Sequence, residues 1–63
     1  MLVLTRRVGE QLVIGEGPNR IVVTVCEIRD GKVRIGTEAP DGTPVDRLEV
    51  WEAKERERNR EQI

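Results

Sequence analysis

The sequence predicts a mainly β fold that ends in an α-helix, and three observations support this class. Short runs of β-branched and aliphatic residues recur as far as residue 47, separated by glycine, proline and asparagine. Asp30-Gly31 lies between two such runs, as in a two-residue hairpin. From residue 48 onward most residues are good helix formers. We therefore expect a single domain over residues 1–63, with five short strands followed by one helix.

The expected strands follow the apolar runs in order. They lie at about 1–7, 11–15, 20–29, 32–37 and 43–47, and the helix lies at about 48–60. Alternation along 20–29 places Ile21, Val23 and Val25 on one face, and Val22, Thr24, Cys26 and Ile28 on the other. We expect this strand to be covered on both faces. A type I′ turn at Asp30-Gly31 requires a positive φ at both residues.

The length and residue inventory predict a homodimer. A chain of 63 residues buries too little surface to be more than marginally stable alone. With one cysteine and no histidine, it lacks the means for an intramolecular disulfide or an ordinary zinc site, and we expect no metal or other cofactor. Association of two chains remains as the source of stability. Because histidine and serine are both absent, we expect no catalytic residues and no enzymatic activity.

The charge balance and hydropathy restrict the class of partner. Eleven basic residues face twelve acidic ones, so the chain lacks the strongly basic character of a nonspecific nucleic-acid binder. Any RNA binding must therefore be local. No apolar run approaches the ~20 residues that cross a bilayer, so we expect no membrane association and a cytoplasmic location.

Four segments of the chain carry a family resemblance. They are the opening residues MLVLTRRVGE, the stretch Val33-Arg34-Ile35-Gly36, Ala39-Pro40, and residues 45–51. Together they resemble the carbon storage regulator (CsrA/RsmA) family of bacterial translational regulators over nearly the whole chain. The resemblance implies a strand-swapped homodimer, a β-barrel or sandwich with helical wings. In it, the first and fifth strands of one subunit pair with the middle strands of the other.

The resemblance also implies a function and a site. It implies a post-transcriptional regulator that binds GGA motifs in mRNA leader hairpins and blocks ribosome access, with regulatory small RNAs and a protein antagonist as further partners. The implied RNA site joins residues of two chains: Leu4, Thr5, Arg6 and Arg7 of one, and Ala39, Pro40, Val45, Arg47 and Glu49 of the other. Unstacked GGA bases expose edges that strand backbones read, while arginines contact phosphates and base planes.

The chain departs from the family pattern at several positions. Asp41, Asp46 and Leu48 stand where the family commonly has lysine, histidine and glutamate, so two departures add negative charge near the expected phosphate path. The loop at 16–19 is longer than in familiar members, and we expect it to lie far from the RNA-binding strands. The competing function is a homodimeric protein-interaction or DNA-binding regulator of the swapped-hairpin type, with altered nucleic-acid affinity.

Several residues also have purely structural interpretations. Arg6 and Arg7 are suited to keeping an edge strand soluble, and Arg47 to an ion pair with Glu10 or Glu49. The remaining assignments are Asp46 as a helix N-cap with Glu49 at the third helical position, Cys26 as a small apolar filler, and Trp51 as the anchor of the helix on the sheet.

Overall fold

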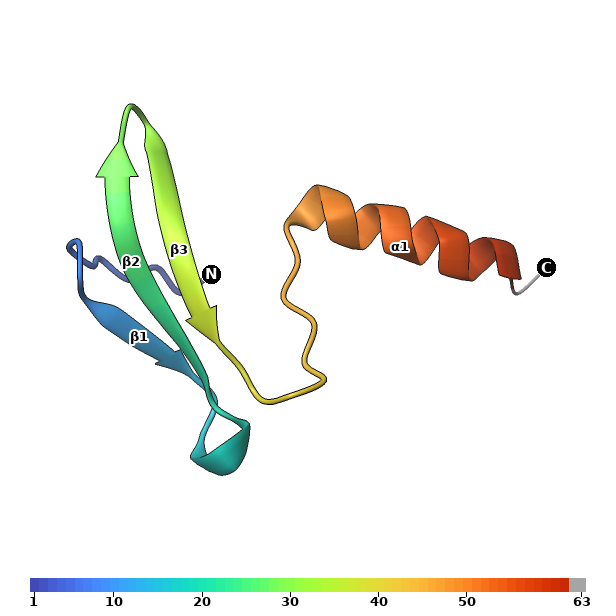
Figure 1. The fold of residues 1–63 in the computed structure, drawn as a ribbon, viewed down its shortest axis with the longest axis horizontal. Coiled ribbons are helices and arrows are strands. Elements are labelled where there is room, and N and C mark those ends of the chain that lie inside the picture. Colours follow the sequence, from blue (N-terminus) through green and yellow to red (C-terminus); the bar gives the residue numbers. More distant parts are fainter. Residues whose placement is uncertain (62–63) are drawn as a thin grey trace.

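The computed structural model describes residues 1–61, with side chains through residue 58. The described chain has three strands, β1 (Gln11–Ile14), β2 (Ile21–Arg29) and β3 (Lys32–Glu38), and one α-helix, α1 (Leu48–Glu61). A short 3-10 helix, η1 (Gly17–Asn19), joins β1 to β2. The strands form one antiparallel sheet in the order β1-β2-β3, and a long connection leads from it to α1 (Figure 1). The predicted mainly β class with a C-terminal helix is confirmed.

The β2–β3 hairpin forms because its two turn residues accept a left-handed backbone. Asp30 has φ 50° and Gly31 has φ 73°, and the flanking pair is Arg29 with Lys32. Glycine adopts this region without steric cost, and aspartate tolerates it better than most residues. Both φ angles have the sign that a type I′ turn requires, so the predicted hairpin is confirmed.

A β-bulge in β2 corrects the predicted assignment of faces. Val25 pairs with Ile35, and Glu27 pairs with Arg34, which leaves Cys26 as the extra residue. An inserted residue reverses the alternation beyond it. Ile28 therefore lies on the face of Val25, although strict alternation predicted the opposite face.

The corrected register gives the sheet one strongly apolar face. Because paired residues share a face, the following side chains lie together: Leu12, Ile14, Ile21, Val23, Val25, Ile28, Val33 and Ile35. The other face is mixed, with Gln11, Val13, Val22, Thr24, Glu27, Arg34 and Glu38. Only one face of this sheet thus has the composition of a protein core. The sequence had predicted that the strand at 20–29 is covered on both faces.

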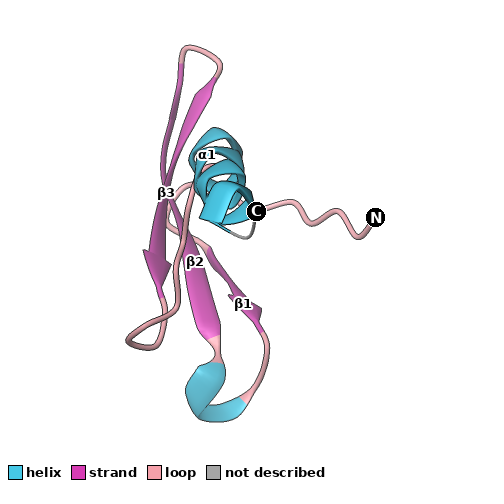
Figure 2. Ribbon diagram, turned by 90° about the vertical axis from the view of Figure 1, so that its right-hand side faces the viewer, coloured by secondary structure: helices cyan, strands magenta, loops and turns pink. Residues whose placement is uncertain are grey.

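The predicted first and last strands are not strands within the described chain. Residues 1–6 and 44–46 make no backbone–backbone hydrogen bond to any described residue. The N-terminal segment projects away from the sheet as a loop (Figure 2). A strand exists only where a neighbouring strand satisfies its N–H and C=O groups, and neither segment has such a neighbour here.

The described chain has no closed hydrophobic core. None of its described residues is fully buried, and Ile28, Val33 and Ile35 on the apolar face are 54%, 52% and 59% exposed. The accessible surface is 6116 Å², whereas a compact 7.2 kDa monomer has about 4,100 Å². The radius of gyration is 14.9 Å, compared with about 11 Å for a compact chain of this length. The apolar face is therefore available to a partner.

The helix does not complete this core. Among the described residues, α1 makes no contact with any of the three strands, and Trp51 is 51% exposed. The prediction that Trp51 anchors the helix on the sheet is wrong for the single chain, because the connection carries α1 away from the strands (Figure 1). Within residues 1–61, no helix has the length and apolar character needed to span a membrane.

The turn geometry predicts the effect of a minimal substitution. We expect Gly31→Ala to lower the free energy of unfolding by about 1–2 kcal/mol, because it places a Cβ at a left-handed position. No atom lies within 4 Å of that Cβ, so the effect reports backbone conformation alone. Denaturant titration at fixed protein concentration measures it. Asp30→Asn, which keeps a residue tolerant of positive φ, is the matched control, and equal stability of the two variants would contradict the assignment.

Candidate functional site

The N-terminal half of the candidate site begins at a turn anchored to β2. The Arg7 N–H donates to Glu10 Oε1 at 2.7 Å, and the Glu10 N–H donates to the Arg7 carbonyl at 3.0 Å. Gly9, with φ 87°, lets its N–H reach the Val25 carbonyl at 2.7 Å. The Val25 N–H in turn donates to the Glu10 carbonyl at 3.1 Å. This turn fixes the point from which residues 1–7 leave the sheet.

Arg6 and Arg7 differ in how they are held. Arg6 Nε donates to the Thr5 carbonyl at 3.0 Å, and its Nη2 lies 3.6 Å from Glu10 Oε2. Both side chains of that ion pair are about 40% exposed, so water weakens their attraction. Arg7 is exposed and forms no ion pair with any described side chain. Thr5 is also exposed, and Leu4 is 57% exposed, so this arm presents polar and apolar groups together.

The second half of the site leads into α1. Arg47 Nε lies 3.4 Å from Glu49 Oε1, with the side chains 79% and 68% exposed. The predicted structural interpretation of Arg47, an ion pair with Glu10 or Glu49, is confirmed for Glu49. Such an exposed pair contributes less than about 1 kcal/mol. Val45 is 52% exposed, and Ala39 and Pro40 are half-buried.

The start of α1 corrects the predicted N-cap. The N–H groups of Val50 and Trp51 donate to the carbonyl of Arg47 at 3.1 and 3.0 Å, so Arg47 occupies the capping position. Glu49 is therefore the second helical residue, where its charge favours the helix N-terminus. The prediction that Asp46 is the cap is wrong by one residue.

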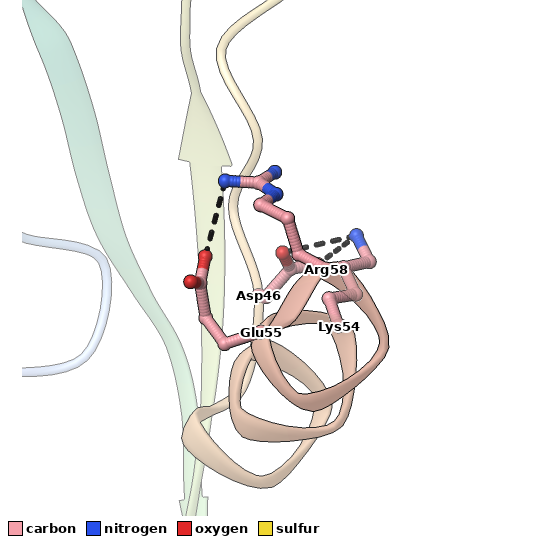
Figure 3. Close-up of polar contacts among 4 residues, drawn as sticks. All are labelled: Asp46, Lys54, Glu55 and Arg58. Carbon is pink, nitrogen blue, oxygen red and sulfur yellow. Dashed lines mark hydrogen bonds and ion pairs between the residues drawn. The ribbon is translucent and has the colours of Figure 1, made fainter. Parts of the chain in front are cut away.

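Asp46 has a different role from the predicted one. Its carboxylate oxygens accept hydrogen bonds from Lys54 Nζ at 3.1 and 3.2 Å, two turns into α1 (Figure 3). The Asp46 side chain is only 17% exposed, so this ion pair is less screened than the others near the site. The bridge ties the segment before the helix to the helix itself. It also compensates one of the two negative charges that depart from the family pattern.

The described chain does not bring the two halves of the site together. Among the described residues, no hydrogen bond or ion pair joins residues 4–7 to residues 39–49. Residues 4–7, Val45 and Arg47 are exposed, and residues 4–6 and 44–46 make no backbone–backbone hydrogen bond within the described chain. If the halves form one site, they do so between chains.

The structure corrects one further prediction and adds residues to the region. The loop at 16–19 was expected to lie far from the site, yet Pro18 and Arg20 line a groove with Ala39 and Pro40. The register explains this position, because Val22 at the start of β2 pairs with Glu38 at the end of β3. The position was open to prediction, since counting outward from the Asp30-Gly31 turn brings residues near 20 beside residues near 39.

Comparison with known proteins places these features in a family. The model of the CsrA global regulator protein family matches residues 1–56. Proteins named translational regulator CsrA are similar over most of the chain. The one from Pseudarthrobacter chlorophenolicus is 55% identical over 53 residues, covering 84% of this chain and 65% of that protein.

Two further relatives show similar identity. The translational regulator CsrA of Thermotoga maritima is 54% identical over 52 residues, which is 82% of this chain and 59% of that protein. That of Rhodopirellula baltica is 50% identical over 56 residues, which is 89% of this chain and 76% of that protein. The chain thus spans less than two thirds of the length of the first two relatives.

The bridge between Asp46 and Lys54 predicts a measurable coupling. We expect Asp46→Asn and Lys54→Met each to destabilise the protein, and the double variant to lose about 0.2–1 kcal/mol less than the sum of the two. The partly buried carboxylate favours the upper part of this range. Denaturant unfolding of the four proteins measures the coupling, and Lys32→Met is the control for loss of a lysine. If the losses of stability in the two single variants sum to the loss in the double variant, Asp46 and Lys54 do not stabilise the protein through their ion pair.

Proposed function

The chain belongs to the CsrA global regulator protein family, and we propose that it is a post-transcriptional regulator that binds GGA motifs in mRNA leader hairpins as a homodimer. The bound protein blocks ribosome access. The observation that carries this proposal is a pair of arms, residues 1–7 and 43–47, each of which combines an exposed arginine and an exposed apolar side chain with few backbone hydrogen bonds in the described chain. The relatives' names, translational regulator CsrA, agree with it.

Three features of the chain support the homodimer. Within the described residues, no side chain of the apolar sheet face is fully buried, no strand pairs with the outer edges of β1 and β3, and residues 1–7 and 43–47 have few backbone partners. A second copy supplies the missing groups: its first and last segments add to the free edges as a first and a fifth strand. The excess over a compact surface, about 2,000 Å² per chain, is of the size that obligate homodimers bury.

The proposed RNA site then forms between the two chains. Leu4, Thr5, Arg6 and Arg7 of one chain face Ala39, Pro40, Val45, Arg47 and Glu49 of its partner. Extended backbone offers N–H and C=O groups to the Watson–Crick edges of unstacked bases. The faces of these bases pack against the apolar side chains of the site. The arginines contact phosphates, and at Arg6 and Arg47 the phosphate replaces the carboxylate of Glu10 or Glu49.

The electrostatics of the site suit exchange of one anion for another. Arg6 and Arg47 each lie near a carboxylate in an exposed, weak ion pair. When a phosphate replaces Glu10 or Glu49 beside the arginine, the free energy lost by breaking the ion pair is therefore small. Because Lys54 compensates Asp46, the remaining acidic departure from the family pattern is Asp41.

The mechanism requires binding alone. A homodimer carries two identical sites, so two GGA segments of one message are held with a high effective concentration at the second site. Occupation of a ribosome-binding site then excludes the ribosome without any covalent step. Regulatory small RNAs with several GGA segments compete with messages for the same sites. A protein antagonist is a further expected partner. The protein acts in the cytoplasm.

Titration into a short RNA hairpin with GGA in its loop tests the function directly. At physiological salt we expect the GGA hairpin to bind at least about tenfold more tightly than the same hairpin with CCU in its loop. Equal binding would reduce the interaction to backbone electrostatics. Absence of binding to both would contradict the proposal and favour a protein-interaction or DNA-binding dimer.

The variant Arg47→Ala tests the site within the same titration. We expect it to weaken binding to the GGA hairpin by about 1–3 kcal/mol while the oligomeric state stays unchanged. Arg29→Ala is the matched control, because Arg29 is an exposed arginine at the C-terminal end of β2 that, like Arg47, pairs with an acidic residue close by in the sequence. Equal affinity of the two variants would remove Arg47 from the site.

A further inference from the structure

A groove of about 180 Å³ lies beside the proposed RNA site. It is lined by Pro18, Arg20, Val22, Glu38, Ala39 and Pro40, all from one chain. Two of these residues, Ala39 and Pro40, belong to the proposed site. The others come from the long loop after β1 and from the paired ends of β2 and β3. The groove is therefore continuous with the proposed site.

The long loop holds Arg20 at the edge of this groove. Gly15 and Gly17 have φ of 85° and 64°, which lets the chain turn sharply into η1. The Arg20 backbone N–H donates to the Gly17 carbonyl at 3.3 Å, and Arg20 Nη1 donates to the same oxygen at 3.0 Å. These two bonds hold the side chain against the loop, so the guanidinium is partly oriented before any ligand binds.

The charged groups of the groove are available for a ligand. Arg20 and Glu38 are exposed, and neither forms an ion pair within 4.0 Å of any described side chain, although both line the groove. This contrasts with Arg6 and Arg47, which each have a carboxylate neighbour. The groove thus offers a cationic donor and an anionic acceptor, with two proline rings as apolar surface.

We propose that this groove binds one unpaired nucleotide next to the GGA motif, a proposal that rests on the proposed RNA-binding function. Arg20 contacts the phosphate, Glu38 accepts a hydrogen bond from an exocyclic amino group, and the base packs against Pro18 and Pro40. A free phosphate uses only the arginine and leaves the carboxylate opposed to it. A nucleotide with an amino-bearing base uses both charges and the apolar surface.

Two GGA hairpins with different loops test the proposal. One has a compact loop, and the other has the same loop widened by unpaired cytidines on both sides of GGA. We expect the protein to bind the widened loop about tenfold more tightly, the effect of one good contact. Arg20→Gln should remove this advantage, leave the compact loop's affinity unchanged, and lower the salt dependence for the widened loop by about 0.7 in slope.

Two companion variants make the result specific. Arg29 is an exposed arginine at the other end of β2. The variant Arg29→Gln should keep the full tenfold higher affinity for the widened loop. Glu38→Gln should weaken the preference for cytidines over uridines, because uracil carries no amino group. Should Arg20→Gln fail to fold, the Nε–H signal of Arg20 in the unmodified protein should shift on adding the widened loop and stay in place with the compact one.

The outcomes separate the groove from the function it rests on. Loss of the tenfold advantage in Arg20→Gln alone, or the selective shift of the Arg20 signal, supports the groove. Tight binding of both hairpins by every variant with equal affinities overturns the groove and leaves the proposed function intact. Failure of the unmodified protein to bind either GGA hairpin overturns the proposed function, and the groove with it.

Discussion

Burial of the apolar sheet face is the constraint on which the rest of this structure depends. Three strands form one sheet and align eight aliphatic side chains on one face, yet the described part of the chain buries none of them fully and leaves Ile14, Ile28, Val33 and Ile35 more than half exposed. The conformational entropy lost on folding is offset mainly by apolar burial, and a chain this short supplies little of it alone. Among the described residues α1 does not contact the sheet, and the proposed second copy is the source of the missing burial.

The same constraint determines what the binding residues can do. The arms that carry Arg6 and Arg47 form no strand because neither has a neighbouring strand among the described residues. In the proposed homodimer, the partner that covers the apolar face also supplies those neighbouring strands, so a single association event would complete both the core and the proposed site. The weak ion pairs around the arginines and the Asp46–Lys54 bridge then act locally, one leaving the arginines open to exchange and the other limiting negative charge beside Arg47.

The sequence predicted the features that local chemistry determines. The Asp30-Gly31 turn and the charged C-terminal helix follow from backbone preference and helix propensity, and both were found where expected. The errors concern features set by tertiary context. The bulge at Cys26 moves Ile28 to the opposite face, and the residue types around it do not predict such an insertion. The attraction of Lys54 for Asp46 is a contact over eight residues that a capping motif does not reveal. The proposed site rests on the family resemblance alone and stays a prediction, because no local pattern in the sequence joins its two halves.

The central claim is that one chain is incomplete without a second copy, and the most direct measurement is sedimentation equilibrium over a wide range of protein concentration. We expect a mass twice the chain mass of 7.2 kDa, and we expect loss of the dimer on dilution to be accompanied by loss of sheet signal in circular dichroism. A monomer that keeps its sheet and unfolds cooperatively at a midpoint independent of concentration would contradict it.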